Sequence, residues 1–253
     1  MATSIALDLA TALDPCLLAR KCGLEPDPWQ RRVLRSAAPR VLLNITRQGG
    51  KSTTTALLGL HSALYTPDML VLMVSPSLRQ SGEIFRKALA MYRQLGRPVP
   101  SESETALTLT LANGSRIVSL PGSDDGTIRG YSGVGLLILD EASRVSDAIY
   151  NAVVPMIAVS GGRVLALSTP WGKRGWWYEA WIGEEEWERY AVPAEQCPRI
   201  SPEFLAGERR RLAPALYLQE YGCTFADTID QMFTYDVVMG AITPDVQPLF
   251  GVA

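Results

Sequence analysis

Short apolar runs alternate with longer amphipathic stretches along most of the chain. Residues 41–45 and 69–75 have the length and composition of buried strands, and the Ala/Leu/Thr-rich segment 52–64 between them has a helical pattern. Residues 78–95 then return to helical spacing with charged residues interspersed. Strands that alternate with helices predict a largely parallel sheet covered by helices on both faces.

The middle of the chain adds a hairpin and two further strands. Leucines at positions 107, 109 and 111 alternate with threonines, and Asn113-Gly114 supplies a turn before residues 116–120, which predicts an antiparallel hairpin. Residues 135–139 and 163–168 are two more apolar runs, separated by a helical stretch near residues 147–159. The pattern as a whole predicts an α/β fold with a mostly parallel central sheet.

The pattern changes from about Trp187 onward. Ser201-Pro202-Glu203 has the serine cap and first-turn proline of a helix start. Residues 204–223 are charged and mostly helical in pattern, with a break expected at Pro214. These features predict a small C-terminal helical subdomain packed beside the sheet.

Composition and charge narrow the class of protein only modestly. Of the 253 residues, 47 % are hydrophobic and 20 % are charged, which is typical of globular proteins and argues against a disordered chain or a fibre. The formal net charge of -2 gives no overall positive field. Contact with nucleic acid would therefore depend on a local basic patch or on an assembled ring.

The four cysteines indicate buried, reduced thiols rather than a metal site, because they form no C-x-x-C pair and His61 is the only histidine. No apolar run approaches the roughly 18 residues of a membrane span. Residues 1–13 lack the basic start of a secretory signal. We therefore expect no membrane partner and a cytoplasmic location.

The strongest chemical signal is the sequence GGKST at residues 49–53, between the first strand and its helix. Gly49 and Gly50 let the backbone wrap a phosphate, whose charge the amide groups and the helix N-terminus stabilise. Lys51 can reach the terminal phosphates, and Ser52, followed by Thr53, can bind Mg²⁺. The fit to the phosphate-loop pattern is imperfect, since Ile45 occupies the first glycine position, so a chance match at a helix start remains the alternative.

Two adjacent acids follow the apolar run at residues 136–139. A parallel strand that ends beside the phosphate loop places Asp140 where it can hold the magnesium shell. Glu141 is then placed to polarise an attacking water, which indicates hydrolysis of ATP rather than transfer to another substrate. The alternative is that the two acids only cap a strand.

Ser168-Thr169-Pro170 also follows an apolar strand. The hydroxyl groups of Ser168 and Thr169 could hydrogen-bond the γ-phosphate or the activated water and transmit its loss to the sheet. A plain turn would have the same sequence.

These three motifs together resemble those of the large terminase subunits of tailed bacteriophages. The segments are TRQGGKST at residues 46–53, LILDEA at 137–142 and STP at 168–170, which are similar to the variant Walker A, Walker B and coupling motifs of that family. The resemblance extends upstream to Pro28-Trp29-Gln30 and downstream through residues 220–225. It covers about residues 25–235 and implies an ASCE-type P-loop NTPase fold.

The resemblance also implies a role for each matching residue. Gln30 would bind the adenine edge, and Arg47 and Gln48 would join Gly49, Gly50 and Thr53 in the ATP-binding loop. Lys51, Ser52 and Asp140 would hold phosphates and Mg²⁺, and Glu141 would activate water.

A glycine-rich segment around Arg129 resembles the one that offers an arginine to the nucleotide of the next subunit in such motors. An arginine supplied in trans stabilises the charge that builds on the γ-phosphate. An ordinary surface arginine is the alternative for Arg129.

The family implies a magnesium-dependent ATPase that moves double-stranded DNA into a procapsid, as a homo-oligomeric ring with portal protein and a small terminase subunit, in the host cytoplasm. The implied organisation is an ATPase core at 1–185, a lid at 186–235 and a linker at 236–253 toward a nuclease domain. We expect no nuclease activity from this chain, because that domain is not recognisable in it.

Two other functions remain open from the sequence. A helicase-like or other DNA-remodelling ATPase would share the core, but helicases carry further motifs in a second core domain. A module that only binds nucleotide would not need Glu141.

Basic and aromatic clusters are weaker indications. Three basic segments at 209–211, 173–174 and 86–87 could contact a phosphate backbone, although a solvated helix face is the favoured explanation of each taken singly. Trp171, Trp176, Trp177 and Trp181 could stack on bases, but core or lid packing is the more common use of such a cluster.

Overall fold

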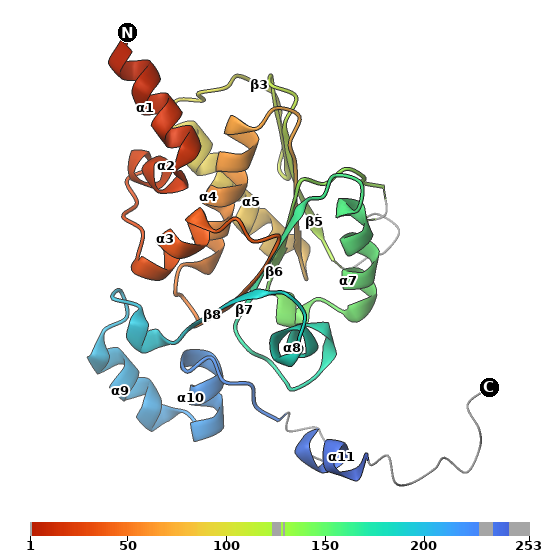
Figure 1. The fold of residues 1–253 in the computed structure, drawn as a ribbon. Coiled ribbons are helices and arrows are strands. Elements are labelled where there is room, and N and C mark those ends of the chain that lie inside the picture. The colour runs from red at the N-terminus through yellow and green to blue at the C-terminus, as the bar shows by residue number, and fades with distance from the viewer. Residues whose placement is uncertain (1, 123–127, 129, 228–234, 243–253) are drawn as a thin grey trace, which may run out of the picture.

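The computed structural model describes residues 2–122, 128, 130–227 and 235–242. Strands of this part of the chain form one sheet in the order β3-β4-β5-β2-β6-β7-β1-β8 (Figure 1). The strands are β1 (Arg40–Ile45), β2 (Leu70–Ser75), β3 (Ser101–Glu104), β4 (Thr108–Leu111), β5 (Arg116–Pro121), β6 (Leu136–Asp140), β7 (Arg163–Ser168) and β8 (Glu188–Val192). Neighbouring strands pair in parallel from β5 through β2, β6, β7 and β1 to β8. At the other edge, β4 pairs antiparallel with β5, and β3 pairs antiparallel with β4.

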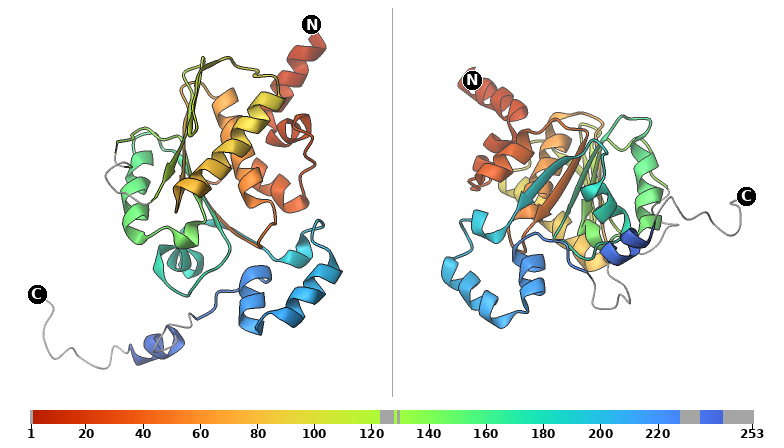
Figure 2. Two further views of the ribbon diagram at one scale, coloured as in Figure 1. Left: turned by 180° about the vertical axis from the view of Figure 1, so that it is seen from behind. Right: turned by 60° about the horizontal axis from the view of Figure 1, so that its bottom comes forward.

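Helices cover both faces of the sheet, as the alternation of strands and helices predicts (Figure 2). One face packs against α2 (Pro15–Lys21), α3 (Pro28–Arg35), α4 (Lys51–Tyr65) and α5 (Leu78–Gln94). The other face packs against α7 (Asp147–Val153) and α8 (Gly175–Ile182). Side chains along a strand alternate between the two cores. Val41 and Leu43 of β1 face the first core, and Leu42 faces the second.

The central strands are mostly apolar because neither of their faces meets water. Every residue of β2 and β6 is buried, and so are five of the six residues of β1 and of β7. Polar groups occur mainly where these strands end. That edge carries Ser75, Asp140 and Ser168, all buried.

Two short helices form a separate cluster beside the sheet. Ser201 caps α9 (Pro202–Arg211) by accepting a hydrogen bond from the amide of Phe204 at 3.2 Å, and α10 (Pro214–Tyr221) begins after the break that Pro214 predicts. Their contact is a small core of Ala194, Leu205, Tyr217 and Tyr221. A further helix, α11 (Tyr235–Ala241), follows later in the chain.

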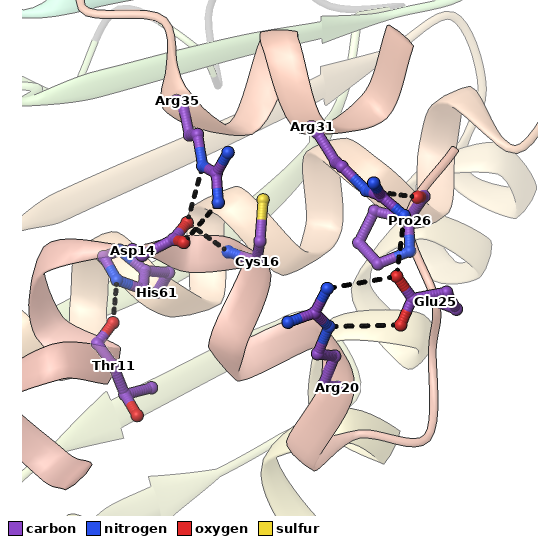
Figure 3. A network of polar contacts seen from close by, with 9 residues as sticks. All are labelled: Thr11, Asp14, Cys16, Arg20, Glu25, Pro26, Arg31, Arg35 and His61. Carbon is purple, nitrogen blue, oxygen red and sulfur yellow. Dashed lines mark hydrogen bonds and ion pairs between the residues drawn. The ribbon is translucent and has the colours of Figure 1, made fainter. Parts of the chain in front are cut away.

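The N-terminal helices are fastened to α4 by polar contacts (Figure 3). His61 on α4 contacts the carbonyl of Thr11 in α1 (Ala2–Leu13) at 2.9 Å. Arg35 donates to Asp14 at 2.6 Å, and the Arg35 hydrogen bond lowers the pKa of Asp14 to about 2. These contacts join α1 to the C-terminal half of α4 and the end of α3 to the start of α2.

The predicted strands and helices are confirmed within a few residues, including the antiparallel pair β4–β5. Seven of the described elements were not predicted from the sequence, namely α1, α2, α3, α8, α11, the edge strand β3, and β8. The last of these lies within the range expected for the lid but pairs in parallel with β1. The predicted helix at 147–159 is shorter, because α7 ends at Val153 and a 3₁₀ turn, Val154–Ile157, contains Pro155.

The predicted state of the thiols is confirmed, since all four cysteines are buried and free. Two of the four clustered tryptophans, Trp176 and Trp177, belong to the core between α8 and the sheet. Within the described residues, no helix has the length and apolar character that crossing a membrane requires.

Gly59 lets α4 lie close to the sheet, and this contact can be tested. A Cβ at Gly59 would be 2.9 Å from Met73 Cε and 3.3 Å from Ile138 Cδ1. We expect Gly59→Leu to lower the free energy of unfolding by about 1–3 kcal/mol through overpacking. Gly207→Leu on α9, where a Cβ would meet nothing within 4 Å, is the matched control and should leave it unchanged or slightly raised. Equal effects of the two substitutions in urea unfolding would contradict this account.

Candidate nucleotide-binding and hydrolytic site

The loop from Thr46 to Gly50 joins β1 to α4 and has a backbone that requires glycine. Gly50 caps α4 with φ 94°, and a Cβ at Gly49 would lie 2.8 Å from Ile45 Cγ2 and 3.2 Å from the Thr46 carbonyl oxygen. The amides at the start of α4 therefore remain accessible at the positive end of the helix dipole. This arrangement suits a phosphate group.

The loop is also anchored from the other side. The Thr46 amide donates to the Val192 carbonyl at 3.0 Å, and the Arg47 amide donates to the Glu220 carbonyl at 3.2 Å. The exposed Arg47 side chain pairs with the Glu220 carboxylate at 3.3 Å. The phosphate loop thus contacts both β8 and α10, so its shape depends on the position of the helical cluster.

Asp140 ends β6 directly beside the loop. Ser52 Oγ donates to Asp140 Oδ1 at 3.3 Å. Only 5 % of Asp140 is exposed, and burial, together with the nearby charge of Glu141, raises its pKa to about 6. A buried carboxylate beside a second acid is stabilised by a cation, and hard oxygen ligands of this kind fit Mg²⁺. Within the described residues there is no cluster of three or more His, Cys, Asp or Glu side chains suited to a metal, so an ion here would need oxygens from a ligand as well.

Lys51 and Glu141 face each other across the same site. Lys51 Nζ lies 3.4 Å from Glu141 Oε1, and the lysine side chain is buried. Glu141 has a left-handed backbone (φ 50°, ψ 46°), an uncommon conformation for a residue that is not glycine. Its carboxylate is therefore directed by the turn that follows β6.

Ser168 connects the acid pair to β7. Its Oγ donates to Glu141 Oε2 at 3.4 Å and lies 2.7 Å from Ser143 Oγ. Thr169 follows it at the same edge of the sheet and is partly buried. Hydroxyl groups on β7 and on the turn that follows β6 therefore lie next to the Glu141 carboxylate.

Gln30 lines a cleft of about 590 Å³ next to the loop, together with Gly50, Thr53, Thr54 and apolar side chains of α2 and α3. The Gln30 side chain accepts from the Asp27 amide at 2.8 Å and donates to Thr54 Oγ1 at 2.9 Å. Its amide is therefore fixed in orientation, with one N–H left for a ligand. An apolar cleft with one oriented amide suits a flat heterocyclic base.

The structure thus brings together most of the residues selected from the sequence. Gly49, Gly50, Lys51, Ser52, Asp140, Glu141 and Ser168 lie around one edge of the sheet, with Thr53 and Gln30 on the adjoining cleft. Arg47 and Gln48 are exposed on the side of the helical cluster, where they line a second cavity of about 320 Å³. Arg129 lies outside the described residues.

Several polar residues of the site were not predicted from the sequence. Ser75 ends β2 beside Asp140, and Asp27, Arg199 and Glu220 contact the loop or its cleft from distant parts of the chain. Ser75, Asp27 and Arg199 belong to no motif, and Glu220 lies in the segment 220–225 of the resemblance but was given no role there. Only the strand order and the position of the helical cluster identify them.

The basic segments show mainly local pairing. Arg211 pairs with Glu208 and Arg86 with Glu83, each within one helix, and Lys173 pairs with Asp227. The Arg144 guanidinium lies 4.0 Å from the centre of the Trp171 ring. These contacts agree with solvated surfaces and do not define a nucleic-acid site.

A family model described as "Terminase large subunit, T4likevirus-type, N-terminal" matches residues 42–237. Large terminase subunits of Thermus phage G20c and Thermus virus P23-45 are each 24 % identical, over 84 % of this chain and 51 % of the relative. The chain therefore spans about half the length of these relatives.

The fold is similar to those of solved phage proteins. The ATPase domain of the Thermus phage P74-26 large terminase superposes with a TM-score of 0.72 at 21 % identity, covering 82 % of this chain and 97 % of that domain. The large terminase of bacteriophage HK97 gives 0.65 at 16 % identity, with 80 % and 51 % covered. The large terminase of a thermophilic bacteriophage, solved in complex with ADP, gives 0.62 at 14 % identity, with 79 % and 53 % covered.

The burial of Asp140 predicts a pH-dependent stability. Because its pKa is raised in the folded chain, the folded state carries a cost that is absent below about pH 4, grows through about pH 6 and is complete above it. We expect Asp140→Asn to raise the free energy of unfolding by about 2 kcal/mol at pH 8, in EDTA and without nucleotide, and by about half as much at pH 5. A gain that is the same at both pH values would show that ionisation of Asp140 is not its cause.

Proposed function

We propose that this chain, which belongs to the terminase large-subunit family, is the ATP-hydrolysing motor part of a large terminase. In this role it drives double-stranded DNA into a procapsid. The observation that carries this proposal is the convergence of the glycine loop, Lys51, Asp140 and Glu141 at one edge of the sheet. The large terminase of the thermophilic bacteriophage has been solved with ADP and with ATP-γ-S, which supports nucleotide binding on this fold.

The geometry supports a specific placement of each part of ATP in the site. The phosphate chain binds the amides at the start of α4, and the base enters the cleft beside Gln30 and Thr53. Ser52 and Asp140 would hold Mg²⁺, which would neutralise the charge of the β- and γ-phosphates. Arg47 and Gln48 complete the loop on the side of α10.

The Lys51–Glu141 ion pair gives a way to couple binding to catalysis. The γ-phosphate competes for Lys51 Nζ, which releases Glu141 from its contact at 3.4 Å. The freed carboxylate then accepts a proton from a water as that water attacks the γ-phosphorus, and ADP and phosphate result. Ser168 and Thr169 respond to the movement of the Glu141 carboxylate and transmit it to the rest of β7.

The helical cluster is the proposed moving lid. Its contact with the loop through Glu220 and the Arg47 amide joins the nucleotide site to α10. The domain division at 1–185, 186–235 and 236–253 remains part of this proposal, with β8 belonging to the main sheet. Double-stranded DNA, a portal protein, a small terminase subunit and a ring of copies are the proposed partners, in the cytoplasm of the host cell.

The paired roles of Glu141 and Lys51 can be separated by mutation. We expect Glu141→Gln to bind ATP like the original chain but to hydrolyse it at least about 100-fold more slowly, because the proton acceptor is lost. Lys51→Ala should lose both binding and turnover. Phosphate release and equilibrium binding of a fluorescent ATP analogue measure the two properties. Glu102→Gln on β3, far from the site, is the matched control, and turnover by Glu141→Gln equal to that of this control would remove Glu141 as the base.

The proposed ring predicts that hydrolysis depends on protein concentration. If Arg129 acts on the nucleotide of a neighbouring copy, the rate per chain should rise as copies associate, and Arg129→Ala should abolish that rise. Steady-state ATPase assays over a range of chain concentrations measure this, with Arg86→Ala as the matched control. A rate per chain that is constant with concentration and unchanged in Arg129→Ala would instead indicate a self-sufficient ATPase.

A further inference from the structure

Arg199 connects the proposed lid to the nucleotide site through two contacts. It lies in the segment between β8 and α9. Its Nη2 donates to the Gly49 carbonyl at 2.9 Å and lies 2.8 Å from Asp27 Oδ2. One guanidinium therefore contacts both the phosphate loop and the segment that leads into α3. The arginine that carries it lies just before the helical cluster.

These two contacts use only one nitrogen atom of the Arg199 guanidinium group, Nη2. Asp27 is largely buried, and its Oδ2 accepts no hydrogen bond of good geometry among the described residues, so the Arg199 charge is its main compensation. Arg199 itself is 49 % exposed, and only its Nη2 has a partner in the described part of the chain. The Nε and Nη1 donors are available to a ligand.

Arg199 forms the wall between two cavities. It lines the cleft of about 590 Å³ with Gln30, Gly50 and Thr53, and also the cavity of about 320 Å³ with Arg47 and Gln48. A Cβ at Gly50 would lie 2.9 Å from Arg199 Nη2, so the guanidinium is directly over the N-cap of α4.

The position of Lys51, the other cation of the site, indicates which phosphate Arg199 can reach. Lys51 Nζ lies beside Glu141, at the end where the terminal phosphate reacts. Arg199 lies over Gly50 and lines the cleft proposed for the nucleoside. The two cations are therefore placed for different phosphates.

We propose that Arg199 binds the phosphate nearest the ribose, so that the bound nucleotide holds the lid segment against the phosphate loop. This inference rests on the proposed function, namely that the site takes ATP. On binding, the guanidinium exchanges the neutral Gly49 carbonyl for a phosphate oxygen and keeps Asp27, because a charge-assisted hydrogen bond is about twice as strong as a neutral one. Arg199 is a binding and positioning residue, and Glu141 remains the base.

The test compares ligands with and without phosphate. Equilibrium binding of ADP and of adenosine is measured by calorimetry for the original chain, Arg199→Ala and Arg199→Lys. We expect Arg199→Ala to weaken ADP binding about tenfold or more while leaving adenosine binding unchanged, and Arg199→Lys to restore part of the ADP affinity. Arg211→Ala, which removes an arginine ion pair from α9, is the matched control and should bind both ligands normally.

The adenosine measurement separates binding from folding, because a misfolded cleft would lose both ligands. Unchanged ADP affinity in Arg199→Ala would overturn the inference, as would an equal loss for ADP and adenosine. Failure of the original chain to bind ADP at all would instead refute the proposed function.

Discussion

The site depends on one electrostatic constraint, the placement of two adjacent carboxylates beside a buried lysine. Asp140 is almost fully buried, and Glu141 lies next to it with Lys51 Nζ at 3.4 Å. Burial of Asp140 and the charge of Glu141 raise the pKa of Asp140, since one lysine charge does not fully compensate two carboxylates. In the proposed function, Mg²⁺ beside the acids and phosphates beside Lys51 and the loop amides would remove this imbalance.

The parallel sheet is what makes this concentration of charge possible. Because β1, β2, β6 and β7 run in the same direction, their carboxyl ends meet at one edge, and polar residues can follow strands that are otherwise mostly apolar. The close packing of α4 at Gly59 and the polar contacts of α1–α3 then fix the loop and the cleft relative to that edge. Stability and chemistry thus use the same elements.

Much of the fold was predictable because it depends on local patterns. The apolar runs of β1, β2, β6 and β7, the helical spacing of α4 and α5 and the turn at Asn113-Gly114 all encode their elements within short windows. β8 was missed because ERYAV is half polar at the sheet edge, and α1 and α2 because they carry no motif. The sites after β1, β6 and β7 were found from motifs, whereas Arg199, Asp27 and Glu220 come from segments far apart in the sequence that only the fold brings together. The roles of these residues, and that of Arg129, remain predictions.

The contacts around the loop also suggest how hydrolysis can produce movement. The loop bonds to α10 through Glu220 and to the segment before α9 through Arg199, so two separate attachments link the nucleotide to the helical cluster. The structure of the Glu141→Gln chain with ATP and Mg²⁺ tests the account most directly. It should show the β- and γ-phosphates on the amides at the start of α4, Lys51 Nζ turned from residue 141 to the γ-phosphate, and Mg²⁺ held beside Ser52 and Asp140. A nucleotide bound elsewhere, or with Asp140 remote from the metal, would contradict it.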